Sequence, residues 1–235
     1  MKILSQDDNL FQFLKVLTDQ VDGSVEARRD GRDWPKNGYT MIGELRLMNI
    51  RNCIEEVVRD KVAGDFLEAG VWKGGAAMFM KACLNFYGDR ERSIFLADSF
   101  MGLPPPKDLY PADKNDTHHT FKALAVSKQE VKSNFQKFNL FDDRIKFIEG
   151  WFDETLYKAP IESLAILRLD GDMYESTWIT LDALYDKVAD GGFIIVDDYG
   201  YIESCRKAVH DFFEKKSINP AITPIDWTGV FWRKH

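Results

Sequence analysis

The segment GDFLEAGVWKGGAAMFMKA, residues 64–82, joins a short apolar run, a glycine-rich turn and a longer apolar stretch. This order predicts a buried strand over 65–69 and a mostly buried helix over 75–87. The glycines between them allow a tight turn and let a ligand approach the backbone closely. Their spacing is G-x-x-x-G-G, not the G-x-G-x-x-G of nicotinamide-dependent enzymes. The segment therefore predicts an α/β protein that binds a ligand other than NAD after its first strand.

Strand and helix patterns alternate along the rest of the chain. Further strands are predicted at 94–97, 145–148, 164–169 and 193–196, and further helices at 45–58, 176–188 and 204–215. Ser127 begins another helix, with a capping-box spacing to Glu130. The tail, 221–234, predicts two short strands joined by a turn at Thr228–Gly229. We therefore expect a mostly parallel seven-stranded sheet with helices on both faces and a C-terminal antiparallel hairpin.

Composition excludes several classes of protein. The 235 residues suffice for one domain, 1–235, and a net charge of −7 without a Lys/Arg stripe argues against nucleic acid as a partner. Apolar stretches are too short to span a membrane, and the N-terminus is too acidic for a signal peptide. The scattered cysteines predict buried free thiols at Cys53, Cys83 and Cys205. We expect a cytoplasmic protein.

Two segments interrupt the alternation of strands and helices. Apolar periodicity disappears over 22–40, where charged residues, glycine and proline dominate, and 102–120 contains four prolines and many polar residues. Loops of this length inside a compact domain usually cover an active site or bind a ligand. We expect both segments to be lids or substrate loops, mobile without ligands.

Acidic residues end the first two predicted strands. Glu68 closes the first, before Gly70, Gly74 and Gly75, and this pattern suits a cofactor with an amine and a carboxylate rather than a pyrophosphate. Asp98 closes the second, where a carboxylate can accept hydrogen bonds from both hydroxyls of a ribose. Their placement on successive strands predicts a nucleoside-type cofactor.

Three more positions are candidates for the adenine end of that cofactor. Gly150 and Trp151 follow the third strand and could bracket the ring, although Trp151 and Phe152 could equally be core residues. Ser127 could meet the adenine edge or only cap its helix.

Carboxylates also gather after the fourth and fifth strands. Asp170 follows the fourth strand, and Asp197 and Asp198 follow the fifth. Crowded like charges repel, and a bound cation relieves the repulsion. An all-oxygen ligand set favours Mg²⁺, Ca²⁺ or Mn²⁺ over zinc or copper. We therefore predict a metal site at these three residues, whereas Asp172 could cap the following helix or lie behind the ligands.

The combination resembles the macrocin O-methyltransferase (TylF-like) family, over about residues 38 to 235. The segments that carry the resemblance are TMIGELRLMNIRNCIEEVVRD (40–60), GDFLEAGVWKGGAAMFMKA (64–82), LADSFMGLPPP (96–106), LAVSKQEVKSNF (124–135), GWF (150–152), LRLDGDMYEST (167–177) and GGFIIVDDYG (191–200). The resemblance implies a Rossmann-like methyltransferase fold with S-adenosylmethionine and Mg²⁺ as cofactors. By position it implies metal ligands at Asp170, Asp197 and Asp198, and cofactor contacts from Glu68 to Gly75, including Trp72, and at Asp98 and Ser99.

The expected activity is therefore methylation of a sugar hydroxyl, with a small molecule, a glycoside, as acceptor. Asp170 is the first choice for the general base, and the loop histidines His118 and His119 are the alternatives. Arg46 could bind the carboxylate of the cofactor or form a surface ion pair. The oligomeric state stays open, with a homodimer as one option.

Three other functions compete with this one. A catechol-type methyltransferase would apply the same metal chemistry to an aromatic vicinal diol. A nucleotide-sugar oxidoreductase should contain G-x-G-x-x-G, which this turn lacks. A non-catalytic binding protein of the same fold has no need of the intact carboxylates.

Overall fold

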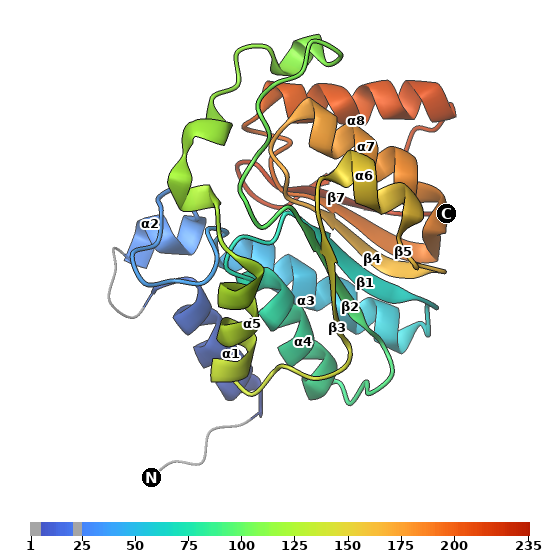
Figure 1. The fold of residues 1–235 in the computed structure, drawn as a ribbon. Coiled ribbons are helices and arrows are strands. Elements are labelled where there is room, and N and C mark those ends of the chain that lie inside the picture. Colours follow the sequence, from blue (N-terminus) through green and yellow to red (C-terminus); the bar gives the residue numbers. More distant parts are fainter. Residues whose placement is uncertain (1–5, 21–24) are drawn as a thin grey trace.

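A seven-stranded sheet forms the centre of the computed structural model, which describes residues 6–20 and 25–235 (Figure 1). Its strand order is β3-β2-β1-β4-β5-β7-β6. The strands are β1 (Asp65–Ala69), β2 (Ile94–Asp98), β3 (Ile145–Glu149), β4 (Leu164–Leu169), β5 (Val188–Val196), β6 (Thr223–Pro224) and β7 (Val230–Arg233). The first five are mutually parallel, while β7 is antiparallel to both β5 and β6. The predicted fold class, including the C-terminal antiparallel pair, is confirmed.

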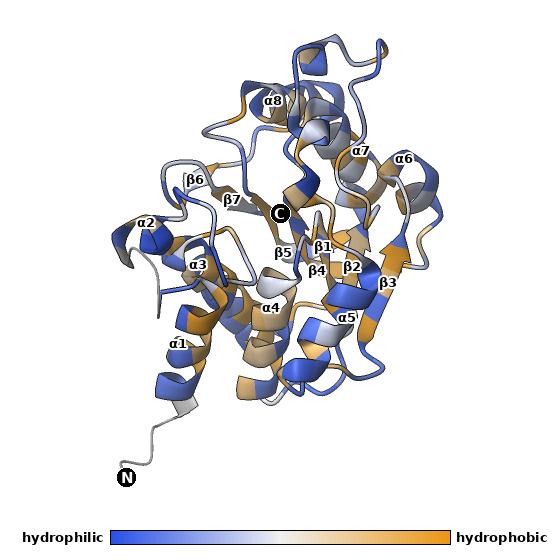
Figure 2. Ribbon diagram, turned by 60° about the vertical axis from the view of Figure 1, so that its left-hand side comes forward, coloured by the Kyte–Doolittle hydropathy of each residue, from blue (hydrophilic) through white to orange (hydrophobic). Residues whose placement is uncertain are grey.

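Helices cover both faces of the sheet (Figure 1). They are α1 (Gln6–Leu17), α2 (Val25–Asp30), α3 (Glu44–Arg59), α4 (Gly75–Phe86), α5 (Lys128–Lys137), α6 (Phe152–Thr155), α7 (Tyr174–Leu184) and α8 (Glu203–Lys216). One apolar core lies between the sheet and α1, α3, α4 and α5, and a second lies between the sheet and α7 and α8. Figure 2 shows hydrophobic strands between helices that also carry hydrophilic residues.

The cysteines and the helices agree with the expectations from composition. Cys53, Cys83 and Cys205 are buried and free. Within residues 6–20 and 25–235, each helix is too short or too polar to cross a membrane.

Strand register brings the functional positions to one edge of the sheet. Ala69 at the end of β1 pairs with Leu169 of β4, and Leu169 pairs with Val196 of β5. Backbone hydrogen bonds continue one residue further, from Asp170 N to Ala69 O (2.8 Å) and from Asp197 N to Leu169 O (2.9 Å). Residues that follow these strands therefore lie side by side.

The predicted helix over 176–188 is wrong at its C-terminal end. Helix α7 ends at Leu184, a single 3₁₀ turn follows over Tyr185–Lys187, and β5 already begins at Val188. The register between β4 and β5 is irregular, because Leu164 pairs with Val188 whereas Ile166 pairs with Phe193. Extra residues in β5 thus interrupt the alternation on which strand prediction depends.

The segment 22–40 is more structured than its sequence indicates, although 22–24 lie outside the described residues. It contains α2, and Arg28 on this helix is almost completely buried. The Arg28 guanidinium donates hydrogen bonds to backbone carbonyls of Thr18, Thr40 and Met41. A buried arginine organises this segment in place of an apolar stripe, so hydrophobic periodicity could not detect it.

The second segment, 102–120, is fastened to the N-terminus of α7. Asp113 lies in a short 3₁₀ helix, Pro111–Asp113, and its buried carboxylate accepts hydrogen bonds from Tyr174 N (2.7 Å) and Glu175 N (2.9 Å). The first backbone N–H groups of a helix have no partner within the helix, so Asp113 caps α7 from a distant loop. The mobility expected for both segments stays a prediction.

Replacing Asp113 by alanine should destabilise the protein by about 1–3 kcal/mol, because two N–H groups at the start of α7 lose a charged acceptor. Urea unfolding followed by circular dichroism measures the difference. Asp108→Ala is the matched control, since Asp108 lies in the same loop but is exposed. Equal stability of the two variants would contradict the capping role.

Candidate active site

A cavity of about 260 Å³ opens at the carboxyl ends of the central strands. It gathers most of the residues that the sequence singles out. Those that line it are Glu68, Gly70, Trp72, Asp98, Ser99, Trp151, Asp170, Asp197 and Asp198. Arg46, His118 and Asp172 line it as well.

The turn after β1 is held against both neighbouring strands. Gly70 has φ +91°, and a Cβ atom there would lie only 1.8 Å from the carbonyl oxygen of Asp170. On the other side, the Asp98 carboxylate accepts hydrogen bonds from Val71 N and Phe100 N, both at 2.7 Å. Gly70 is therefore required for close contact with the turn at Asp170, and Asp98 fixes the rest of the loop.

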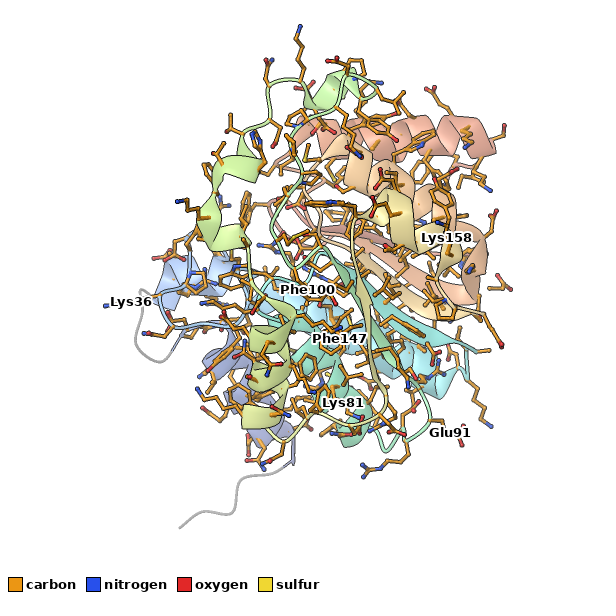
Figure 3. All side chains as sticks on the ribbon, in the orientation of Figure 1. Lys36, Lys81, Glu91, Phe100, Phe147 and Lys158 are labelled. Carbon is orange, nitrogen blue, oxygen red and sulfur yellow. The ribbon has the colours of Figure 1, made fainter. Side chains whose placement is uncertain are left out.

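Asp98 also borders the cavity, and its ribose-binding role stays a prediction. Burial raises the pKa of Asp98, and the hydrogen bonds from the backbone N–H groups of Val71 and Phe100 oppose this increase. The loop after Asp98 is anchored by Phe100, whose ring lies 5.7 Å from that of Phe147 on β3 (Figure 3). Ser99 donates to Gly102 O (2.7 Å) and so shapes the same loop.

Four predicted cofactor residues lie elsewhere. Gly74 (φ +88°) packs against Val131 of α5, and Gly75 N donates to Tyr39 O (2.9 Å). Both glycines thus permit close packing behind the turn. Ser127 and Gly150 line a second pocket beside Ser99, and Ser127 also caps α5 by accepting from Glu130 N (3.2 Å).

Arg168 bonds to three carboxylates of the site, although it is not among the site residues predicted from the sequence. Its side chain is completely buried on β4, opposite Glu68 of β1. Its guanidinium donates to Glu68 Oε1 (2.5 Å), Asp170 Oδ2 (2.8 Å) and Asp197 Oδ1 (2.5 Å). The Arg168 guanidinium therefore joins Glu68 on β1 to Asp170 and Asp197, two of the predicted metal ligands. A single charge inside the apolar run LAILRL was the available signal.

Arg46 holds the same aspartate from the opposite side. Its Nη1 donates to Asp197 Oδ2, and its Nε donates to Asp226 Oδ2 (2.9 Å). The Arg46 side chain is only 6% exposed, so the ion pair is buried. Of the two alternatives for Arg46, the surface ion pair is therefore wrong, and binding of the cofactor's carboxylate stays a prediction. Asp197 is consequently fixed through both oxygens by two arginines.

The carboxyl groups around these arginines have raised pKa values. Burial raises the pKa of Glu68 to about 8, although Arg168 acts in the opposite direction. Burial and mutual repulsion also raise the pKa values of Asp170, Asp172 and Asp198. The acidic side chains here outnumber Arg46 and Arg168, and either protonation of a carboxyl group or a further cation would relieve their repulsion.

Asp170, Asp197 and Asp198 converge as predicted. Each offers one oxygen, and these oxygens lie within 4.8 Å of one another. Asp170 and Asp198 are partly exposed, whereas Asp197 is buried. Each Asp197 oxygen keeps a lone pair beside its arginine bond, so the hydrogen bonds do not prevent coordination.

The two loop histidines differ in position. His118 lines the cavity, and its Nδ1 lies 2.6 Å from Asp116 Oδ2. His119 is exposed. Only His118 thus lies beside the carboxylates that could orient an acceptor.

Comparison with known proteins identifies the family. Residues 4–234 match the family model described as Macrocin-O-methyltransferase (TylF). The chain belongs to the macrocin O-methyltransferase family. It is 47% identical to demethyldecarbamoylnovobiocin O-methyltransferase of Streptomyces niveus, over 89% of this chain and 80% of that protein. It is 43% identical to mycinamicin III 3''-O-methyltransferase of Micromonospora griseorubida, over 89% and 84%. The protein is therefore an O-methyltransferase.

Solved structures agree with this family. The O-methyltransferase NovP superposes with a TM-score of 0.95 at 43% identity, covering 98% of this chain and 99% of NovP. The calicheamicin methyltransferase CalS11 has a TM-score of 0.66 at 17% identity, covering 99% and 94%. The second comparison supports the fold alone. A macrocin O-methyltransferase fold implies S-adenosylmethionine as methyl donor.

Gly70→Ala should disrupt the site more than an ordinary glycine substitution, because its Cβ atom would meet the Asp170 carbonyl. The control is Gly88→Ala: Gly88 also has positive φ (+76°), but nothing lies within 4 Å of the added atom. We expect Gly88→Ala to cost about 1 kcal/mol from backbone strain alone. Gly70→Ala should lose more stability and bind S-adenosylhomocysteine more weakly, as urea unfolding and calorimetry would measure. Identical behaviour of the two variants would show that the close contact is unimportant.

Proposed function

We propose that this O-methyltransferase methylates a sugar hydroxyl of a glycosylated natural product and requires Mg²⁺. The observation that carries the proposal is the convergence of Asp170, Asp197 and Asp198 beside the cavity of a macrocin-type enzyme. The names of the two curated relatives support the acceptor class, since novobiocin and mycinamicin derivatives are their substrates.

The cavity lining suits S-adenosylmethionine, which supplies an electrophilic methyl group on a positively charged sulfur. Glu68 Oε2 is buried and lacks a hydrogen-bond partner in the described part of the chain. A cofactor amine would give this oxygen a donor, and Asp98 remains placed to accept from ribose hydroxyls. Trp72, Ser99 and Trp151 border the same space.

The carboxylate cluster suits a hard divalent cation. Asp170, Asp197 and Asp198 would hold it, since oxygen-only sets are what Mg²⁺ prefers. When bound, Mg²⁺ lowers the pKa of an alcohol and fixes its direction. Arg168 and Arg46 keep Asp197 oriented, while the partly exposed Asp170 and Asp198 face the cavity.

Asp170 is our proposed proton acceptor. Its side chain is 29% exposed, so an acceptor hydroxyl can reach it, and Arg168 holds only its Oδ2. His118 is the alternative, because Asp116 orients its ring beside the same cavity. We favour Asp170, because it belongs to the carboxylate cluster that would orient the acceptor hydroxyl and would therefore lie close to that hydroxyl.

The acceptor class and the metal are tested together with purified enzyme and S-adenosylmethionine. In Mg²⁺ we expect mass spectrometry to detect one added methyl group on an aryl glycoside, and none on catechol. EDTA should abolish transfer and added Mg²⁺ should restore it, while calorimetry should still detect S-adenosylhomocysteine in EDTA. Full activity in EDTA would exclude the metal role, and methylation of catechol alone would favour the catechol-type alternative.

Asp170→Asn and His118→Gln distinguish the two candidate bases. We expect Asp170→Asn to lower kcat by at least about 10²-fold, the usual contribution of a general base, and His118→Gln to change it only a few-fold. Mn²⁺ titration followed by electron paramagnetic resonance separates loss of the base from loss of the metal. A large fall in kcat for His118→Gln, with Asp170→Asn near the wild-type rate, would assign the proton to His118.

A further inference from the structure

Aromatic residues from four separate segments surround the outer part of the cavity. We call them the aromatic rim: Trp34, Phe121, Tyr201 and Trp227. Trp34, Tyr201 and Trp227 line the same cavity as the aspartates. The rings meet edge to face in two pairs, Trp34 with Phe121 (6.3 Å) and Tyr201 with Trp227 (5.4 Å). The rim thus joins loops that are remote in sequence.

Three of these four rings are exposed, and two of the three line the cavity, whereas Phe121, at 44% exposed, lies outside the lining. Trp34 is 51% exposed and Tyr201 is 71% exposed, although both border the cavity. Trp227 is held behind Tyr201, because its Nε1 donates to Asp30 O (2.9 Å) and Arg32 packs over its ring (4.8 Å). Large apolar side chains gathered at the edge of a site commonly mark a binding surface. Trp34 and Tyr201 therefore expose ring surface at the cavity, and Trp227 beside Tyr201 is held in place by its contacts with Asp30 and Arg32.

The charged residues of the cavity lining indicate which class of molecule could bind beside Trp34 and Tyr201. The lining cations Arg46 and Lys107 are both engaged, Arg46 by Asp197 and Asp226, and Lys107 by Asp153 and Glu175. Arg32 packs on Trp227 and lies 3.9 Å from a carboxylate oxygen of Asp30. The rest of the charged lining is mostly acidic. Among the described residues, the lining offers a nucleotide diphosphate no unpaired arginine or lysine, whereas an uncharged ring system would gain apolar contact on the exposed rings.

We propose that Trp34 and Tyr201 bind the apolar ring system to which the methylated sugar is attached. The two side chains would then distinguish a sugar that carries such a ring system from the same sugar without one. This inference rests on the proposed function, because the sugar hydroxyl must lie at the aspartates for its aglycone to reach the rim.

The test compares three acceptors that share one sugar: p-nitrophenyl α-L-rhamnoside, methyl α-L-rhamnoside and TDP-rhamnose. For wild-type enzyme with Mg²⁺ we expect the highest kcat/KM with the aryl glycoside and the lowest with TDP-rhamnose. Trp34→Ala and Tyr201→Ala should each raise KM for the aryl glycoside roughly tenfold, the scale of a lost apolar contact, with kcat unchanged. KM for the methyl glycoside should stay within about twofold, because that acceptor has no ring to place on the rim.

Tyr157→Ala is the matched control, since Tyr157 is also 51% exposed but lies outside the cavity lining. It should leave all three KM values unchanged. Equal effects of Trp34→Ala and Tyr201→Ala on the aryl and methyl glycosides would overturn the inference while leaving the proposed function intact. Preference for TDP-rhamnose would also overturn it. If wild-type enzyme transfers methyl to none of the three sugars but does so to catechol, the proposed function itself fails.

Discussion

A guanidinium buried in the middle of a sheet is costly unless carboxylates surround it, and this requirement organises the site around Arg168. The residue has no exposed surface and bonds to acidic side chains that follow or lie on three different strands. Removing it would leave Glu68 and Asp170 without their cationic partner and Asp197 with Arg46 alone. Glu68 on one side of the cavity and Asp170 and Asp197 on the other therefore share one positive charge, and neither side can be arranged independently of the other.

The parallel register makes this sharing geometrically possible. Because Ala69, Leu169 and Val196 pair across β1, β4 and β5, the residues that follow these strands leave the sheet at the same level. Gly70 then contacts the Asp170 carbonyl region, and a side chain at that position would separate the two turns. The candidate site is thus a set of strand ends held together by backbone hydrogen bonds, and Arg46 and Arg168 balance part of its negative charge.

Around this rigid centre, loops supply the walls of the acceptor side. Arg28 secures the N-terminal segment through backbone carbonyls, and Asp113 secures the proline-rich segment through the start of α7. Both residues act through hydrogen bonds to backbone groups in distant parts of the chain. They let loops without an apolar stripe hold exposed rings such as Trp34 beside the cavity, where we propose that the aglycone of the acceptor binds.

The sequence by itself determined the strands, the glycine turn and the acidic residues that end β1, β2, β4 and β5. Those features follow from local periodicity and from the rule that parallel strands present their carboxyl ends at one edge. Only the tertiary structure decided which residues meet. It gave Arg168 its three carboxylates, buried Arg46 against Asp197, and turned Gly74 and Gly75 toward packing instead of the cavity. These outcomes depend on contacts between residues far apart in the chain, such as Arg46 and Asp197, and local sequence patterns carry no information about such distances.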